Sequence, residues 1–232
     1  MDFLINSIIK ALELIVSLDP ELTGIVVLSF KVSGFAIIIS TIIALVITLV
    51  LDLKNFAGKN IIVTLINTLM GLPPVVAGLM LYLIFSRSGL LGFMSILYTP
   101  AAMVVAQIVL ATPIIAALSY AAVVSADPGL KFTALTLGAA PCQATIKVMK
   151  NVRYSILASV LAGLGRVMAE VGAVLIVGGN IAGFTRVMTT AIALEADKGD
   201  FELAIALGMI LLCIAFVLNA ALFHFQKKGV QR

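Results

Sequence analysis

The sequence predicts an all-α, polytopic membrane protein with five transmembrane helices and an N-terminal helix at the membrane interface. Of its 232 residues, 62% are hydrophobic and 11% are charged, whereas soluble domains have roughly 45–50% apolar and 25% charged residues. Long apolar runs recur from residue 32 to residue 223 with only short polar breaks between them. Because these breaks leave no room for a soluble domain, we expect one transmembrane domain over residues 1–232.

Residues 2–18 are predicted to form the interfacial helix. Polar side chains recur there at spacings of three and four residues, at Asp2, Asn6, Lys10, Glu13 and Ser17. That spacing places them on one face of a helix and leaves the opposite face apolar. Helices of this kind lie in the headgroup region of a bilayer, and a sixth span is the alternative.

Five longer stretches can cross the bilayer: about 22–52, 60–86, 99–122, 153–178 and 203–226. A hydrocarbon core about 30 Å thick requires about 20 helical residues. Helices are expected because backbone groups find no water in lipid, and the sequence lacks the alternating segments of a membrane barrel.

Two of these spans contain proline. Pro73 and Pro74 lie in the middle of the second span, where Pro73 cannot donate to the helical hydrogen bonds, so a bend is expected. Pro113 predicts a kink in the third span. Bends occur in ordinary helix bundles, but interrupted helices also expose backbone groups to substrates in transporters. The sequence leaves both roles open.

Basic residues in the connections predict the orientation, because Lys and Arg are retained on the cytoplasmic side. The external side carries three of them, Arg87, Arg186 and Lys198. The cytoplasmic side carries nine, namely Lys54, Lys59, Lys131, Lys147, Lys150, Arg153, Lys227, Lys228 and Arg232. We therefore expect a cytoplasmic C-terminus.

The two longest connections have different compositions. The cytoplasmic connection, about 123–152, is rich in helix formers around Gly138 and Pro141 and is expected to fold into short helices. The external connection, about 179–202, is expected to be solvated and able to meet a partner. Its charged residues include Glu195, Asp197, Lys198, Asp200 and Glu202.

Several function classes are excluded by what the sequence lacks. It has no phosphate-binding GxxxxGK[ST] motif, and Gly163-Leu164-Gly165 does not continue into a dinucleotide fingerprint. The single histidine, His224, and the isolated Cys142 and Cys213 provide neither a metal site nor a disulfide framework. No cluster could support intramembrane catalysis, and the scattered basic residues do not predict nucleic-acid binding.

Glu170 is the acidic residue that lies well inside a predicted span, and Arg166 precedes it by four residues. On a continuous helix the two side chains would share one face. Charges in the membrane interior usually face a helix bundle or a watery path. The pair is therefore either a helix–helix contact or part of a translocation path or dimer seam.

Glycines end the fourth predicted span, at Gly178, Gly179 and Gly183 around Asn180. Glycine allows a backbone N–H group to approach an anion closely, but helix termination alone also explains this composition. An oxyanion in transit would be held by such neutral donors and not by many fixed charges, because a tightly bound ion could not leave.

Three segments together resemble the permease subunits of type I ABC importers, most closely the tungstate and molybdate branch. The first is Asp127-Pro128-Gly129-Leu130 followed by Thr133–Ala139, which is similar to the cytoplasmic EAA loop that docks into the ATPase. Phe132 stands at the position of the motif's glutamate, and Asn151 at that of its closing proline. The second segment runs from Gly71-Leu72-Pro73-Pro74 to Gly92.

The third segment is the most specific. It contains Glu170-Val171-Gly172 and then Gly179-Asn180-Ile181-Ala182-Gly183-Phe184-Thr185-Arg186, similar to Glu-x-Gly and Gly-Asn-Ile-x-Gly-x-Thr in molybdate permeases. The resemblance implies ATPase-coupling residues at Asp127, Pro128, Thr133, Ala134, Leu137, Gly138 and Ala139. It implies translocation-path or gate residues at Pro73, Pro74, Arg166, Glu170, Gly172, Gly179, Asn180, Gly183 and Thr185.

The resemblance also implies the rest of the machine. This subunit would pair with a second copy of itself in a prokaryotic cell membrane, with two cytoplasmic ATPase subunits and an extracytoplasmic oxyanion-binding protein. The subunit itself would hold no cofactor and would not be an enzyme, since ATP and Mg are bound by the ATPase. Tungstate is the expected cargo, and molybdate or sulfate the alternatives. An ion-coupled transporter that uses Glu170 is the competing class, and a small membrane enzyme or assembly factor would lack an active cluster.

Overall fold

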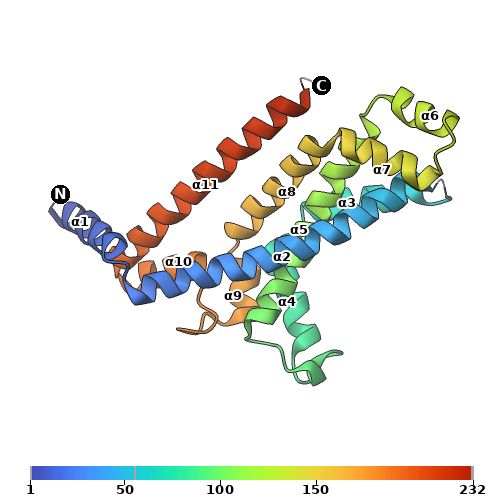
Figure 1. Cartoon of the computed structure of the whole chain (residues 1–232). Coiled ribbons are helices and arrows are strands. Elements are labelled where there is room, and N and C mark those ends of the chain that lie inside the picture. Colours follow the sequence, from blue (N-terminus) through green and yellow to red (C-terminus); the bar gives the residue numbers. More distant parts are fainter. Residues whose placement is uncertain (1, 55, 231–232) are drawn as a thin grey trace. The chain divides into compact units, whose positions relative to one another are not determined.

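The computed structural model describes residues 2–54 and 56–230, and the side chains of residues 6–54 and 56–227. Arg232, counted for the orientation, lies outside these residues, as do the side chains of Asp2 and Lys228. The described part is helical and has no strand (Figure 1). Its elements are α1 (Asp2–Val16), α2 (Pro20–Leu53), α3 (Lys59–Met70), α4 (Pro74–Phe85), the 3-10 helix η1 (Gly92–Met94), α5 (Pro100–Val124), α6 (Pro128–Thr136), α7 (Pro141–Asn151), α8 (Arg153–Met168), α9 (Gly172–Gly178), α10 (Met188–Lys198) and α11 (Phe201–Val230).

The described helices offer three to five candidate spans, and the predicted five is the upper number. Three described helices, α2, α5 and α11, are long and apolar enough to cross a membrane by themselves. Two interrupted pairs, α3 with α4 and α8 with α9, raise the number to as many as five if each pair is one span. α5 continues without a break through Pro113.

Both interrupted spans are broken close to residues that were predicted to line the translocation path. The second span is broken after Met70, and α4 begins with Pro74 at its first position, so the predicted distortion is confirmed as a complete break. The fourth span is also broken, between Met168 and Gly172. This second break was not predicted, because the segment contains no proline and Glu170 was expected to lie within a continuous helix.

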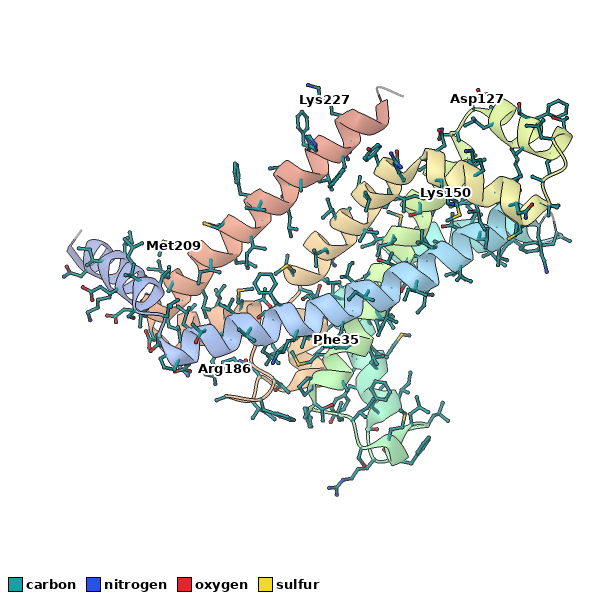
Figure 2. The ribbon with its side chains drawn as sticks, viewed as in Figure 1. Phe35, Asp127, Lys150, Arg186, Met209 and Lys227 are labelled. Atoms are coloured by element: carbon teal, nitrogen blue, oxygen red, sulfur yellow. The ribbon has the colours of Figure 1, made fainter. Side chains whose placement is uncertain are left out.

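Large apolar side chains on the long helices are exposed. In α2, Phe35, Ile38 and Ile42 each leave about 60% of their surface exposed, and Figure 2 shows Phe35 projecting from the helix. Contiguous exposed apolar surface of this kind marks a membrane or a partner. Together with the apolar spans, it supports a multi-pass membrane protein.

The chain divides into two compact units, each made of three segments. The first unit comprises residues 1–36, 73–107 and 167–217, and the second comprises residues 37–72, 108–166 and 218–232. The helices α2, α5 and α11 contribute residues to both units.

In the first unit, α4 packs closely against α9 (Figure 1). Gly78 makes this approach possible, because a Cβ at its position would lie 2.7 Å from the Cα atom of Ala173. Ala77, Ala173, Val174 and Val177 are buried around the contact. Small residues allow helix backbones to approach in membranes, where van der Waals packing takes the place of the hydrophobic effect.

The external connection is more ordered than its charge predicted. It contains α10, in which Met188, Thr190 and Glu195 are buried. The backbone N–H of Met188 donates to Ser29 Oγ of α2 at 2.8 Å. Asp197, Lys198 and Asp200 are exposed as expected, but the expectation of solvation is wrong for Glu195, whose charge is compensated by ion pairs with Arg186 and Lys198.

The N-terminal segment is the separate short helix that the sequence predicted. Ser7 and Ala11 are buried on one face of α1, and Lys10 pairs with Glu202 at the start of α11. The hydrogen bond to Glu202 raises the pKa of Lys10 above its ordinary value.

In the second unit, the predicted cytoplasmic connection folds as a helical hairpin of α6 and α7 (Figure 1). Gly138 lies in the turn with φ of 88°, a left-handed conformation that favours glycine. The prediction of short helices in this connection is confirmed.

We expect Gly78→Ala to destabilise the protein, because the added methyl group meets the backbone of Ala173 and not a flexible side chain. Overpacking of this kind costs about 1–3 kcal/mol and should lower the Tm of the detergent-purified protein by several degrees. Gly34→Ala is the control, since the space around its Cβ position is open. An unchanged Tm for Gly78→Ala would contradict the close packing of α4 on α9.

Candidate functional site

The predicted coupling residues lie together on α6 and in the turn that follows it. Asp127 caps α6, since its Oδ1 accepts a hydrogen bond from the N–H of Gly129 at 2.8 Å, and Pro128 occupies the first helical position. These residues fit their places because a carboxylate satisfies free N–H groups at a helix start, and proline has no N–H to lose.

The turn after α6 uses the remaining coupling residues. The Thr133 carbonyl accepts from the N–H of Leu137, and the Ala134 carbonyl accepts from the N–H of Ala139. Gly138 supplies the left-handed residue between them. The backbone of the hairpin tip is thus held by its own hydrogen bonds.

α6 exposes its apolar side chains. None of its residues is buried, and Phe132 is 69% exposed, as is 83% of Leu137 directly after the helix. Figure 2 labels Asp127, at the start of this helix. Exposed apolar side chains at the tip of a polar connection are typical of a surface that a partner covers.

A polar cluster that the sequence did not reveal ties this hairpin to α2. Asp52 Oδ2 accepts hydrogen bonds from Lys131 Nζ of α6 and Thr145 Oγ1 of α7, both at 2.6 Å. Lys131 Nζ also donates to the Asp52 carbonyl at 3.1 Å. The residues are 79 and 93 positions apart in the sequence, so no local pattern could have found them.

The predicted path residues of the first unit gather where α4 and α9 begin. Pro73 and Pro74 start α4, and Gly172 starts α9. A Cβ on Gly172 would lie 2.7 Å from Val75 Cγ2 and 3.6 Å from both the Val75 nitrogen and Glu170 Oε1. The Glu170 carboxyl group therefore lies near the starts of both helices.

Glu170 is buried and engaged at this point. Its Oε1 accepts a hydrogen bond from the N–H of Ala173 at 3.1 Å, and its carbonyl accepts one from Thr189 Oγ1 at 2.7 Å. The side chain thus satisfies a free N–H group at the start of α9. The helix that was expected to carry both Arg166 and Glu170 is not continuous, because α8 ends at Met168, with Arg166 in its last turn.

Gln107 is another buried polar residue at the break between α8 and α9, and it was not predicted from the sequence. Its Nε2 donates to the carbonyl of Val167 at 3.2 Å, in the last turn of α8, where carbonyl groups lose their helical partners. The signal that could have identified Gln107 was its polar amide within the otherwise apolar sequence of α5.

The glycine turn after α9 is held together internally. Gly179 and Gly183 both have φ of 71°, and Asn180 has φ of 49°. Thr185 Oγ1 donates to the Gly178 carbonyl at 2.6 Å and accepts from the N–H of Ile181 at 2.9 Å. The Ile181 carbonyl accepts from the N–H groups of Phe184, Thr185 and Arg186. These donors are used within the turn, which favours helix termination over anion binding for them.

Arg186 follows the turn and lies beside the first turns of α2 (Figure 2). Its Nη1 lies 3.4 Å from Glu21 Oε1 and 3.6 Å from Glu195 Oε1. It borders a pocket of about 350 Å³ with Gly183, Glu21 and Lys31. Two carboxylates therefore offset the charge of Arg186.

The described residues contain no group of three or more His, Cys, Asp or Glu side chains that could hold a metal ion.

We expect Thr185→Val to destabilise the protein by about 1–3 kcal/mol, because it leaves the buried Gly178 carbonyl and the partly buried N–H of Ile181 without their partner. Thr185→Ser keeps the hydroxyl group and should stay close to the wild type. Thermal unfolding in detergent measures both variants. A Thr185→Val protein as stable as Thr185→Ser would show that the hydroxyl does not hold the turn.

Comparison with known proteins places this arrangement among permeases. No protein-family model matches the chain. The tungstate uptake system permease protein of Peptoclostridium acidaminophilum is 37% identical over 98% of this chain and 100% of its own length. The "Probable anion ABC transporter permease protein" of Haloferax volcanii is 41% identical over 89% of this chain and 91% of its own length. The tungstate uptake system permease of Campylobacter jejuni is 31% identical over 94% and 92% of the two chains.

Solved structures show the same fold at low sequence identity. A chain of a bacterial alginate ABC transporter matches with a TM-score of 0.72 at 16% identity, over 90% of this chain and 80% of its own. A chain of an amino acid ABC transporter matches with a TM-score of 0.66 at 18% identity, over 92% and 96% of the two chains. The chain belongs to the family of ABC transporter permease proteins that includes the tungstate uptake permeases.

Proposed function

We propose that this chain carries an oxyanion, tungstate first among the candidates, through the membrane as the permease subunit of an ATP-driven importer. The observation that carries the proposal is the α6–α7 hairpin, whose segment resembles the ATPase-docking loop and which exposes Phe132 and Leu137. The tungstate uptake permeases that match almost the whole chain support the choice of cargo.

The proposal includes the partners that such a machine requires. A second copy of this chain, two cytoplasmic ATPase subunits and an extracytoplasmic binding protein would complete the importer. The ATPases would bind ATP and Mg, and this subunit would hold no cofactor. The excess of basic residues predicted for one side, which includes the hairpin, supports a cytoplasmic C-terminus.

The cycle would be alternating access. Closure of the ATPases on ATP would pull the docked hairpins together and open the dimer outward, and hydrolysis would reset it inward. The proposed path or gate residues lie at the start of α4 (Pro73, Pro74), at the start of α9 (Glu170, Gly172) and in the turn after α9 (Gly179, Asn180, Gly183, Thr185), with Arg166 at the end of α8. Interrupted helices at such positions are a recurring feature of transporters.

The competing ion-coupled mechanism needs Glu170 as a site for a proton or sodium ion. Its Oε1 instead accepts a hydrogen bond from the N–H of Ala173 at the start of α9. A structural cap explains the position of this buried carboxyl group, and the ATP-driven importer is therefore favoured.

We expect the reconstituted importer to hydrolyse ATP faster when its binding protein carries tungstate. The complex contains this chain, its ATPase and its binding protein in liposomes, and tungstate, molybdate and sulfate are titrated separately. If molybdate or sulfate stimulates ATP hydrolysis at a lower concentration than tungstate does, that oxyanion and not tungstate is the transported substrate. Failure of any ATPase to associate would overturn the importer itself.

Replacing Phe132 with serine should weaken association with the ATPase. Buried large apolar side chains contribute about 1.5–3 kcal/mol each, so affinity should fall by about 10-fold or more. Co-purification and titration in detergent measure the change. Phe93→Ser is the matched control, because Phe93 is also exposed but lies in η1, at a distance in the sequence from the hairpin. Equal losses for both variants would contradict docking through α6.

A further inference from the structure

We infer that Asp52 is the positioning residue through which movement of the coupling hairpin is transmitted to the transmembrane helix α2. The inference rests on the proposed function, because it assigns a role within the ATP-driven cycle. It goes beyond that function by naming the connection between the surface that docks and a helix that spans the membrane.

Three elements meet at one carboxyl group. Asp52 lies in the last turn of α2, Lys131 in the middle of α6 and Thr145 in α7, and both partners reach the same Oδ2 atom. Thr145 is fully buried, and the Asp52 side chain is 16% exposed. Partial exclusion of water strengthens such charge-assisted hydrogen bonds compared with an exposed pair.

The contact joins α2 to both arms of the hairpin. α6 carries the exposed Phe132 directly after Lys131, so a force on the docking surface acts next to the ion pair. α7 carries the buried Thr145. A displacement of the hairpin as a body therefore requires either that the end of α2 follows or that these hydrogen bonds break.

A cleft of about 460 Å³ lies between Leu45, Val46 and Leu49 of α2 and Ile146 and Met149 of α7, with α8 residues completing it. Leu51 of α2 and Ala144 and Val148 of α7 are nevertheless buried, so the polar cluster adds directional contacts to the apolar packing of these helices. The cleft also provides room for a change in the angle between the helices.

Replacing Asp52 should have different effects if the residue positions α2 during transport than if it only stabilises the fold. If Asp52 only stabilises the fold, its replacement lowers the amount of protein and its Tm, and the remaining protein transports normally. If Asp52 transmits movement, the variant assembles with its ATPase and hydrolyses ATP, but transports less oxyanion for each ATP.

The test compares Asp52→Asn, Thr145→Val and the exchange Asp52→Lys with Lys131→Asp in the reconstituted importer. Glu202→Gln is the matched control, since it removes the exposed ion pair with Lys10 in the first unit. Each preparation is measured for ATPase association, ATP hydrolysis and tungstate taken up per ATP, with molybdate and sulfate used if they stimulate the wild type.

We expect Asp52→Asn to reduce uptake per ATP about 10-fold, a size typical of coupling between sites, while association with the ATPase persists. Thr145→Val should show a smaller loss, and the exchange should recover much of the coupling, because Thr145 can accept from Lys as well as donate to Asp. Uptake per ATP equal to wild type in Asp52→Asn would overturn the inference. Loss of assembly in Asp52→Asn together with normal uptake per ATP in Thr145→Val would also overturn it. A wild-type complex that no oxyanion stimulates would instead overturn the proposed function.

Discussion

Every backbone N–H and C=O group inside a bilayer must find a partner within the protein, because lipid provides none. Most of this chain meets that requirement with long helices such as α2 and α5. At the breaks after Met70 and Met168 the helical pairing stops, and the freed groups need specific solutions. Proline removes one donor at the start of α4, and the Glu170 carboxyl group accepts from the N–H of Ala173 at the start of α9. Gln107 donates to the carbonyl of Val167.

These solutions also explain the composition of the breaks. Gly78 and Gly172 allow α4 and α9 to approach so closely that a methyl group would collide with the neighbouring helix. Thr185 provides one hydroxyl that both donates and accepts in the terminal turn. The first unit therefore contains two helix starts and a glycine turn, held mainly by neutral hydrogen bonds.

In the proposed cycle, the second unit would transmit the movement of the ATPase to the membrane-spanning helices. Its hairpin exposes apolar side chains on α6 for a partner, and Asp52 connects both arms of the hairpin to α2. An ion pair with two short hydrogen bonds is directional, whereas apolar packing permits sliding. A directional contact is suited to transmitting a displacement between helices.

The sequence by itself determined the membrane class, the spans and the helical hairpin, because apolar run length and helix signals are local properties of the chain. It also indicated a bend at Pro73, since the consequence of a missing N–H does not depend on distant residues. Only the tertiary structure decided that the fourth span breaks at Glu170, that α10 buries Glu195, and that Asp52 meets Lys131 and Thr145. Each of these depends on a partner far away in the sequence, such as Thr189 for Glu170 or Arg186 for Glu195. A buried polar group is stable only when such a partner is present, and folding alone brings the two together.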